Sequence, residues 1–397
     1  MLKSEETNNK EKKYIDEACA HFRGLLEEQL SRAGVIAKNM EKTDFSRMPQ
    51  ITVGICDGDG IGPIIMKEAE NLLNFLLQDE IESGKVKLKK IEGLTIENRI
   101  AQKVAVPVEV LEGIKKCNVI LKGPTTTPKG GTLESANVTL RRELDLFANI
   151  RPVEVSEESI DWIFFRENTE GEYTLGSRGI EIPEELAMDF KVTTDAGTKR
   201  IARAAFEYAR ANGKKRVSIV TKANIMKKTD GKFSDICHRV AEDYPEISAD
   251  DWYIDIMAAN LLNKQIRKDF QVVLLPNLYG DIITDEAAEI QGGVGTAGSA
   301  NIGDKYAVFE AIHGSAPRMI EEGLGEYANP SSIFKAMEMM IRHIGFKDKA
   351  DLLNFAINKC TRQEKKVVVT GNSDGATCKE FSKYVMDAAK AEMDPLK

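Results

Sequence analysis

Short apolar runs alternate along the chain with longer stretches in which apolar residues recur at helical spacing. Short runs rich in Val, Ile, Leu and Phe are typical of buried strands. Such runs lie at residues 119–121, 163–165, 217–220, 272–275 and 367–369. A further strand is predicted to begin at Ile51, followed by a glycine-rich turn and a helix over residues 64–77. This alternation predicts an α/β protein with a largely parallel sheet.

Two segments depart from the alternation. Residues 14–36 carry apolar side chains at helical spacing with charged side chains between them, so residues 1–48 are predicted to form an amphipathic helical extension. The helix would pack either on the rest of its own chain or on a second subunit, and the pattern fits both. Residues 171–195 contain several glycines and a proline between short β-like pieces, which predicts an arm or hairpin insertion.

The composition narrows the classes of function and compartment. The 397-residue chain carries a net charge of -8, which argues against the basic face that a nucleic-acid-binding module needs. Its six cysteines are widely separated and its four histidines lack metal-site spacing, so no zinc site is expected, and reduced thiols indicate a cytoplasmic protein. No apolar run is long enough to span a membrane, and the N-terminal residues lack the apolar core of a signal peptide.

Two aspartates are the first candidates for a metal site. Asp281 and Asp285 follow the apolar run 272–275, which Pro276 closes, and they are four residues apart at the start of a predicted helix. They would share one helix face just past the end of a strand, where open α/β sheets bind ligands. Two carboxylates suit Mg²⁺ or Mn²⁺. Taken alone, the pair is also typical of a solvated helix start, where acidic groups interact with the positive end of the helix.

The glycine-rich turn is a weaker candidate. A dinucleotide-binding fingerprint reads G-x-G-x-x-G, whereas Gly58, Gly60 and Gly62 give G-x-G-x-G followed by Pro63. The turn therefore does not match a Rossmann loop. Its glycines permit a tight turn and a close approach of the backbone, which fits a structural turn and a ligand-facing loop equally.

Arginines near strand ends or loop junctions indicate an anionic ligand. Arg141, Arg151 and Arg166 offer rigid forks that match carboxylates. One such arginine would more often pair with a structural aspartate, but three of them suggest a small acid with several carboxylates. Ser135 and Asn137 precede Arg141 and add short neutral hydrogen-bonding groups.

Several motifs carry a family resemblance. In order along the chain they are GDGIGP (58–63), KGPTTTP (122–128), SANVTLR (135–141), FRENTEGEY (165–173), TKANIMK (221–227), NLYGDIITD (277–285) and HGSAP (313–317). Any one of them is a weak signal, but the set in this order is specific. The chain resembles the metal-dependent β-decarboxylating dehydrogenases, the isocitrate and isopropylmalate dehydrogenase family.

The resemblance implies a two-domain α/β fold of the isopropylmalate/isocitrate dehydrogenase type rather than a Rossmann fold. A large cofactor-binding domain would combine residues 49–146 and 292–397, and a small domain at 147–291 would carry the arm and the dimer interface. The resemblance also implies a homodimer or higher homo-oligomer with shared active sites. The extension at 1–48 is not part of the common pattern.

For the chemistry, the resemblance implies oxidation of a 2-hydroxy acid by NAD(P)⁺, loss of CO₂ from the β-keto acid, and Mg²⁺ or Mn²⁺ to hold the developing enolate. It assigns metal binding to Asp281, Asp285 and the partner subunit's Asp255, although the spacing from Asp255 to Asp281 is slightly long. It assigns proton transfer to Tyr173 and Lys222. Such side chains normally titrate near about pH 10, so work near neutrality would require the metal and the cationic groups to lower their pKa values.

The segment before Arg141 bears on the substrate. The isocitrate dehydrogenases of the family resemble this chain in carrying S-x-N there, where the hydroxyl and amide meet a third carboxylate, and the isopropylmalate enzymes carry apolar residues. Burying a carboxylate against leucines is unfavourable, so Ser135 and Asn137 favour a tricarboxylate, isocitrate. Homoisocitrate stays open, as do isopropylmalate and tartrate. A non-catalytic regulatory subunit is a further alternative, which the presence of Tyr173 and Lys222 argues against.

The resemblance also assigns a cofactor site. Its residues here are Lys122, Thr126, Thr127, His313, Gly314, Ser315, Ala316, Arg318 and Asn329. The residue after Pro317 discriminates the ribose, because a basic group suits the 2′-phosphate of NADP and an acidic group suits the 2′-hydroxyl of NAD. Arg318 therefore favours NADP. The segment 319–327 is longer than usual, and its Glu321 and Glu322 could meet a ribose hydroxyl, so NAD stays open.

Overall fold

A single mixed sheet of ten strands organises the part of the chain that the computed structural model describes, residues 2–36, 43–128, 133–176 and 178–393. The strand order is β2-β1-β3-β12-β11-β4-β5-β10-β8-β9. The strands are β1 (Ile51–Cys56), β2 (Val86–Lys90), β3 (Val119–Lys122), β4 (Ala148–Val155), β5 (Ile160–Glu167), β8 (Arg216–Thr221), β9 (Ser248–Tyr253), β10 (Val272–Leu275), β11 (Gly298–Ile302) and β12 (Ala307–Ala311).

Most neighbouring strands in this sheet are parallel. Antiparallel pairing is confined to the centre, where β11 pairs with β12 and β4, and β4 pairs with β5. The remaining neighbours pair in parallel. The predicted α/β architecture with a largely parallel sheet is therefore confirmed.

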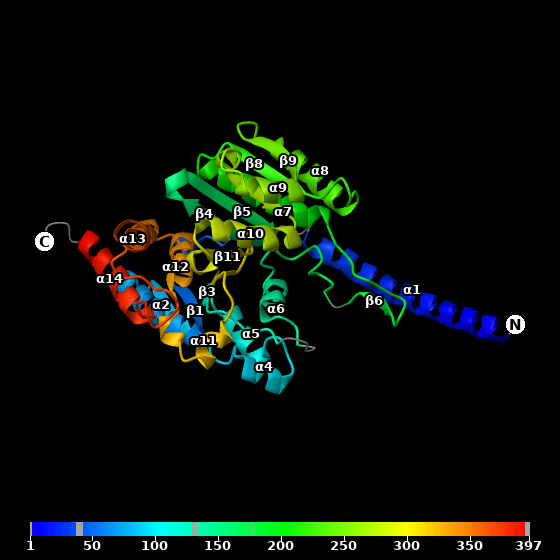
Figure 1. Ribbon diagram of the computed structural model, residues 1–397, viewed down its shortest axis with the longest axis horizontal. Helices are drawn as coiled ribbons and strands as arrows, with labels where there is room; N and C mark the ends of the chain where they lie inside the picture. Colours follow the sequence, from blue (N-terminus) through cyan, green and yellow to red (C-terminus); the bar gives the residue numbers. More distant parts are fainter. Residues whose placement is uncertain (1, 37–42, 129–132, 177, 394–397) are drawn as a thin grey trace.

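Helices cover both faces of the sheet (Figure 1). The longer ones are α1 (Leu2–Ile36), α2 (Gly62–Leu76), α4 (Ile96–Gln102), α5 (Val108–Lys115), α6 (Ala136–Glu143), α7 (Asp195–Ala211), α8 (Thr229–Ala241), α9 (Ile254–Leu262), α10 (Asn277–Gln291), α12 (Ser331–His343), α13 (Lys347–Asn358) and α14 (Cys378–Met393), and the short ones are α3 (Gln78–Glu82) and α11 (Pro317–Glu321). The helix predicted at 64–77 corresponds to α2, which begins slightly earlier because Pro63 suits the first turn of a helix.

The buried apolar side chains form four clusters. Two of them join β1, β3 and β12 to the helices around them: α2, α12, α13 and α14 in one cluster, and α5 and α6 in the other. The third cluster joins β5, β8 and β10 to α7 and α8. The fourth joins the same strands to α9 and α10. The division into a large domain (49–146 and 292–397) and a small domain (147–291) follows the same partition, and we retain it as a proposal.

The run at 367–369 was predicted as a strand, and this prediction is wrong. The segment pairs with no strand among the described residues. It follows Lys365, whose backbone is left-handed (φ 50°). Val367 and Val369 pack against the core cluster of α2 and α12, while Val368 is exposed. The alternating burial resembles that of a strand, but the segment lies on the helical layer and not in the sheet.

The extension and the arm project together from the body (Figure 1). Within the segment 171–195, β6 (Ile180–Ile182) and β7 (Leu186–Met188) form a separate antiparallel hairpin. The C-terminal half of α1 contacts α7, and the rings of Phe22 and Phe190 lie 5.3 Å apart. Leu25 is buried, whereas Ile15, Leu26 and Leu30 stay exposed. The extension thus docks on its own chain along part of one face, and a contact with a second subunit stays a prediction.

The helices of the described ranges differ from membrane-spanning helices in length or in apolar character. None of the helices there combines the length and the apolar character that crossing a bilayer requires.

Candidate active site

A polar cavity of about 290 Å³ lies beside the central antiparallel strands of the sheet. The predicted site residues that line it are Ser135, Asn137, Arg141, Arg151, Tyr173, Asp281, Asp285, His313 and Gly314. Two helices supply facing walls of this cavity. On α6, Asn137 and Arg141 are four residues apart, and on α10 Asp281 and Asp285 have the same spacing, so each pair shares one helix face.

The carboxylates of α10 are held by arginines from two strands. Arg166, at the end of β5, forms an ion pair with Asp281. Arg151, on β4, donates to Asp285 Oδ1 at 2.9 Å and to Thr284 Oγ1 at 2.6 Å. Burial opposes ionisation of Asp281, but Arg166, the hydrogen bond from Tyr173 and the charge of Arg151 together outweigh burial and hold the pKa of this carboxyl below its usual range. Asp281 is therefore a carboxylate at neutral pH.

Burial acts on Arg166 in the opposite direction. The side chain is fully buried, and burial together with the nearby Arg141 lowers the pKa of Arg166 to about 9. Asn277 accepts from its Nε at 2.9 Å and from its Nη2 at 2.7 Å. These contacts fix the plane of the Arg166 guanidinium with one edge toward Asp281. An anionic ligand beside Asp281 would be a further hydrogen-bond acceptor for this guanidinium.

Tyr173 enters the cavity from the turn after β5. Its hydroxyl donates to Asp281 Oδ2 at 2.8 Å, and its ring lies 5.3 Å from the Arg166 guanidinium carbon. Burial, and next the negative charge of Asp281, raise the pKa of Tyr173. The sequence analysis required a lowered pKa for acid/base work near neutrality. The pKa of Tyr173 is raised instead, so the hydroxyl is protonated at neutral pH.

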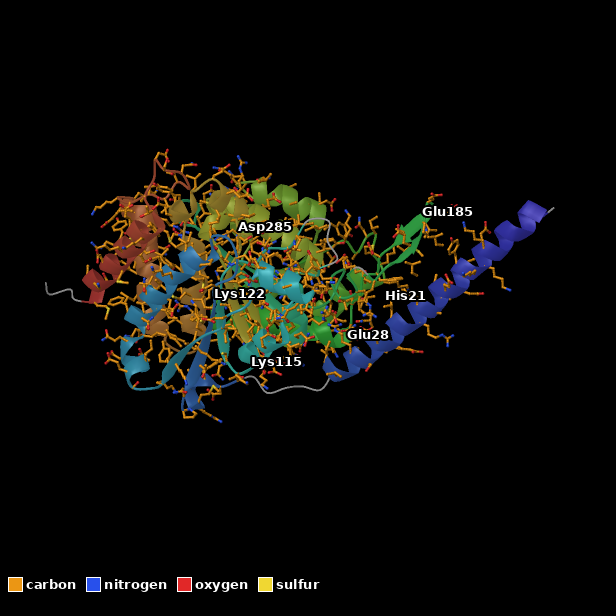
Figure 2. The ribbon with its side chains drawn as sticks, turned by 90° about the horizontal axis from the view of Figure 1, so that it is seen from below. His21, Glu28, Lys115, Lys122, Glu185 and Asp285 are labelled. Carbon is orange, nitrogen blue, oxygen red and sulfur yellow. The ribbon has the colours of Figure 1, made fainter. Side chains whose placement is uncertain are left out.

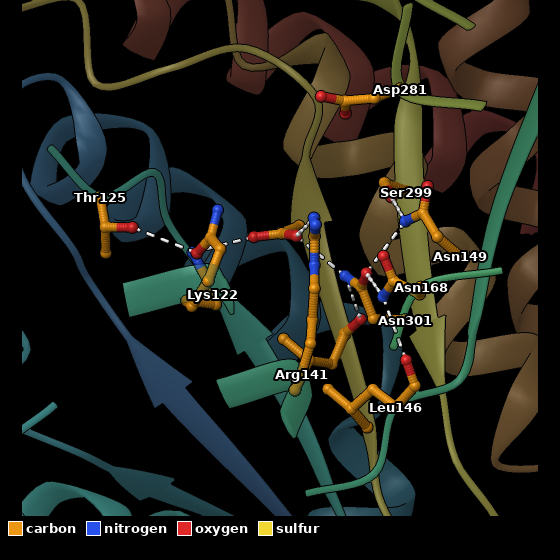
Figure 3. A network of polar contacts seen from close by, with 12 residues as sticks. Lys122, Thr125, Arg141, Leu146, Asn149, Asn168, Asp281, Ser299 and Asn301 are labelled. Atoms are coloured by element: carbon orange, nitrogen blue, oxygen red, sulfur yellow. Dashed lines mark hydrogen bonds and ion pairs between the residues drawn. The ribbon is translucent and has the colours of Figure 1, made fainter. Parts of the chain in front are cut away.

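Glu310 of β12 was not among the site residues predicted from the sequence. Its carboxylate accepts from Lys122 Nζ at 2.9 Å and from Asn301 Nδ2 at 2.8 Å, and Arg141 lies at 3.6 Å (Figure 3). Burial disfavours its charge, but Lys122 and Arg141 outweigh burial and lower the pKa of Glu310 to about 2. The sequence does contain a sign of this residue, because Glu310 is a lone acidic residue in the otherwise apolar strand Ala307–Ala311.

An amide network ties β4, β11 and the turn after β5 together. Asn149 donates to Ser299 Oγ at 2.7 Å and to Asn301 Oδ1 at 2.9 Å, and Asn168 donates to the same oxygen at 2.9 Å (Figure 3). All three asparagines are buried. The sequence offered no signal for this network, because its members come from distant strands and only tertiary pairing brings them together.

Lys122 was predicted to contact the cofactor, and the structure places it inside the protein. Its side chain is 1% exposed and also donates to the Gly123 carbonyl at 2.9 Å. Lys122 pairs with the Glu310 carboxylate, which in turn pairs with Arg141. A contact of Lys122 with a cofactor stays a prediction.

Two further predicted residues lie outside the cavity. Lys222 Nζ donates to Asp255 Oδ1 at 2.6 Å, and neither residue lines the site of its own chain. Exposed apolar side chains occur on α9, on α10 and in the loop before α8: Ile225, Ile256, Leu262 and Ile282. The resemblance assigns Lys222 and Asp255 to the neighbouring subunit's site, and their separation from the cavity within one chain fits that assignment.

The donor set for a divalent cation is partial within one chain. No group of three histidine, cysteine, aspartate or glutamate side chains is close enough to hold a metal within the described ranges. Asp281 and Asp285 supply two hard oxygen ligands on one helix face beside the cavity, which suits Mg²⁺ or Mn²⁺.

The predicted cofactor residues gather around the glycine-rich turn. Thr126 Oγ1 and Ser315 Oγ are 2.6 Å apart, and Asp59 accepts from the Thr126 amide at 2.7 Å. A Cβ atom on Gly60 would lie 2.0 Å from the Ser315 carbonyl oxygen, and the φ of Gly60 is +58°. The glycine-rich turn therefore packs directly against the HGSAP loop. This close packing agrees with the interpretation of its glycines as a structural turn. Asp59, which was not assigned from the sequence, also accepts from the Ile96 amide at 2.7 Å, so its carboxylate ties the turn to the segments of Thr126 and Ile96.

The remaining cofactor candidates are more open. Burial lowers the pKa of His313, and its Nε2 has no hydrogen-bond partner in the described part of the chain. Gly314 and Thr127 are exposed, and Ala316 is left-handed (φ 44°) just before α11. Arg318 is 86% exposed and pairs with Glu322 at 2.6 Å, and Asn329 caps the Ser331 amide at 2.9 Å.

The mixed α/β sheet, the arginine cluster and the two aspartates on one face of α10 are the features expected of the dehydrogenase family that the motifs resemble. A family profile for isocitrate/isopropylmalate dehydrogenase matches residues 52–385. The chain belongs to the isocitrate/isopropylmalate dehydrogenase family.

Individual relatives agree with the family assignment. The chain is 41% identical to "Isocitrate dehydrogenase [NADP]" of Rickettsia prowazekii over 77% of its own length and 62% of that protein. It is 37% identical to "Isocitrate dehydrogenase [NAD] catalytic subunit 5, mitochondrial" of Arabidopsis thaliana, over 88% of this chain and 92% of the relative. The crystal structure of isocitrate dehydrogenase from Methylococcus capsulatus superimposes with a TM-score of 0.76 at 32% identity, covering 86% of this chain and 100% of that one.

Proposed function

We propose that this chain oxidises isocitrate and decarboxylates it to 2-oxoglutarate, with NAD(P)⁺ as the oxidant and Mg²⁺ or Mn²⁺ as the cation. The observation that carries the proposal is that Arg141 and Arg151 line one small cavity with Ser135 and Asn137, and that Arg166 pairs with Asp281 of the same lining. Three guanidinium groups match three carboxylates, and the serine hydroxyl and the asparagine amide give the third carboxylate polar neighbours.

The residues of the chain divide the work. Arg141 and Arg151 hold carboxylates, and Asp281 with Asp285 would hold the cation. When bound, the cation supplies a Lewis acid to the C2 oxygen and the nicotinamide ring accepts a hydride. Tyr173, which is protonated, delivers a proton to the carbon that loses CO₂.

The proposed active enzyme is a homodimer or a higher homo-oligomer. The partner subunit's Lys222 would take the proton of the C2 hydroxyl, and the partner subunit's Asp255 would complete the metal ligands. The exposed apolar side chains beside Lys222 and Asp255 support burial of this surface against another copy.

Mixing two inactive variants tests the shared site. Lys222→Met and Asp285→Asn would each be inactive alone. Co-refolded together, they form mixed dimers in which one of the two sites is intact, and about a quarter of the wild-type rate should return. Mixtures that stay inactive while mixed dimers form would contradict the shared site.

The finer assignments concern the cofactor and the compartment. We propose NADP as the preferred cofactor, since the exposed Arg318 could exchange its pairing with Glu322 for a 2′-phosphate. Initial rates with NAD and NADP, for wild type and Arg318→Ala, test this, because the variant should lose rate selectively with NADP.

The widely spaced free cysteines support a cytoplasmic location.

Homoisocitrate is the second candidate substrate, because it carries the same three carboxylates and is one methylene longer. Rates with isocitrate, homoisocitrate, isopropylmalate and tartrate under the same conditions separate these acids. Absence of turnover with every acid and with the cation present would instead support a non-catalytic regulatory subunit.

A further inference from the structure

The extension helix α1 reaches the segment that carries Tyr173. Arg32, near the end of α1, donates to the Thr169 carbonyl at 3.0 Å and lies 3.4 Å from Glu170 Oε1. Glu28, one turn earlier on α1 (Figure 2), accepts two hydrogen bonds from Arg178 at the start of the arm, at 2.8 and 2.6 Å. The helix is thus tied to both ends of the turn around Tyr173.

The contact of Arg32 is the more protected of the two. The Arg32 side chain is 24% exposed and that of Glu170 is 4% exposed, whereas Glu28 and Arg178 are about half exposed. Solvent-exposed pairs contribute little, and partly buried charge-assisted hydrogen bonds contribute more. The connection between α1 and the site therefore depends mainly on Arg32.

The segment at Thr169 and Glu170 is connected in turn to the reacting groups. The Glu170 carbonyl accepts from Asn277 Nδ2 at 2.9 Å, and Asn277 Oδ1 accepts from Arg166. Arg166 pairs with Asp281, the acceptor of the Tyr173 hydroxyl. A continuous set of hydrogen bonds therefore runs from α1 to the carboxylate assigned to the cation.

Tyr173 and α1 also border the same space. A small cavity of about 70 Å³ is lined by Glu28, Gln29 and Arg32 from α1 and by Tyr173 and Thr174 from the turn. The α6 residues Val138 and Arg142 close it from the side of the substrate arginine. Tyr173 thus lines both this cavity, which it shares with α1, and the larger polar cavity.

The turn around Tyr173 has little regular structure to hold it. Residues 168–176 belong to no strand, and their one bridge in the described part of the chain joins Gly171 to Val192. Arg166, by contrast, lies in β5 and is paired with neighbours on both β4 and β10. Loss of support from α1 should therefore displace Tyr173 more than Arg166.

We infer that α1 is a built-in support for the active site, with Arg32 as the positioning residue that holds the Tyr173 turn in its reactive place. The inference rests on the proposed function, since it gives Tyr173 the role of proton donor. The extension lies outside the matched region 52–385, so the family assignment does not supply this role.

Arg32→Ala tests the inference in the full-length protein. A displaced proton donor slows the chemical step, so kcat with isocitrate should fall about tenfold while KM changes less. Arg32→Lys keeps a cation that reaches the Thr169 carbonyl and should restore most of kcat. The matched control is Arg23→Ala, which removes an exposed arginine from the same helix and should leave kcat unchanged.

Hydrogen exchange supplies a readout that does not need turnover. Amides of residues 169–176 should exchange faster in Arg32→Ala than in wild type or Arg23→Ala. Wild-type kcat and wild-type exchange in a folded Arg32→Ala protein would overturn the inference. Should that variant fail to fold, Arg32→Gln takes its place in the same comparison. A wild-type chain without isocitrate turnover would overturn the proposed function alone, because the exchange comparison would still test the support.

Discussion

Replacing Glu310 by glutamine should destabilise the protein through the buried charges that it leaves behind. The side chain is almost fully buried, and its pKa falls from 4.5 to about 2 in the folded chain. At about 1.4 kcal/mol for each unit of pKa, this fall corresponds to about 3 kcal/mol of stability at neutral pH. Glu310→Gln keeps the shape and the contact with Asn301, but Lys122 and Arg141 lose their shared counter-charge. Breaking one side of a buried ion pair costs about 3–5 kcal/mol, in agreement with the pKa argument.

The assay is urea unfolding followed by circular dichroism, at a fixed protein concentration so that assembly contributes equally. The matched control is Glu112→Gln, since Glu112 is exposed. Because the folded pKa is depressed, the contribution of Glu310 is fully present above about pH 4.5 and is lost as the pH falls toward 2. The difference between wild type and Glu310→Gln should shrink over that range. A difference of less than about 1 kcal/mol at pH 7 would refute the reasoning.

Other substitutions test single roles in the site. Tyr173→Phe should lower kcat by about 10²–10⁴-fold with isocitrate binding retained, as a steady-state titration would show, and a near-normal kcat would remove Tyr173 from proton transfer. Asn137→Leu should lower kcat/KM for isocitrate by about a hundredfold without lowering the melting temperature, because a carboxylate would then meet an apolar side chain. An unchanged kcat/KM would show that the third carboxylate lies elsewhere. Asp281→Asn should abolish cation-dependent turnover in a folded protein, and substantial turnover that still responds to Mg²⁺ would contradict its assignment as a ligand.

The local patterns predicted the sheet well where strands are buried on both faces. The strand at 272–275 was predicted with its observed bounds, because a fully apolar run closed by proline has few alternatives. The run at 367–369 has similar residues, yet it packs on the helical layer. Composition cannot distinguish these environments, since the difference lies in which distant residues cover the segment.

The part of the candidate site formed by motif residues around one cavity could be predicted from the sequence. The part formed by contacts between segments distant in the sequence could not. Arg141, Arg151 and Asp281 lie together as the family order suggested. Glu310 supplies the negative charge that pairs with the buried ammonium group of Lys122. It comes from β12, and no local pattern in the sequence predicts that β12 pairs with β3. The contact of Arg32 with Thr169 spans a separation along the chain that no periodicity reports.

The most direct test of the central claim is the initial rate of NAD(P)H formation by the purified chain with isocitrate, with and without Mg²⁺. The account predicts turnover that requires both isocitrate and the cation, that stops on chelation, and that exceeds the rate with isopropylmalate. Faster turnover of isopropylmalate, or isocitrate oxidation that persists without any divalent cation, would contradict it.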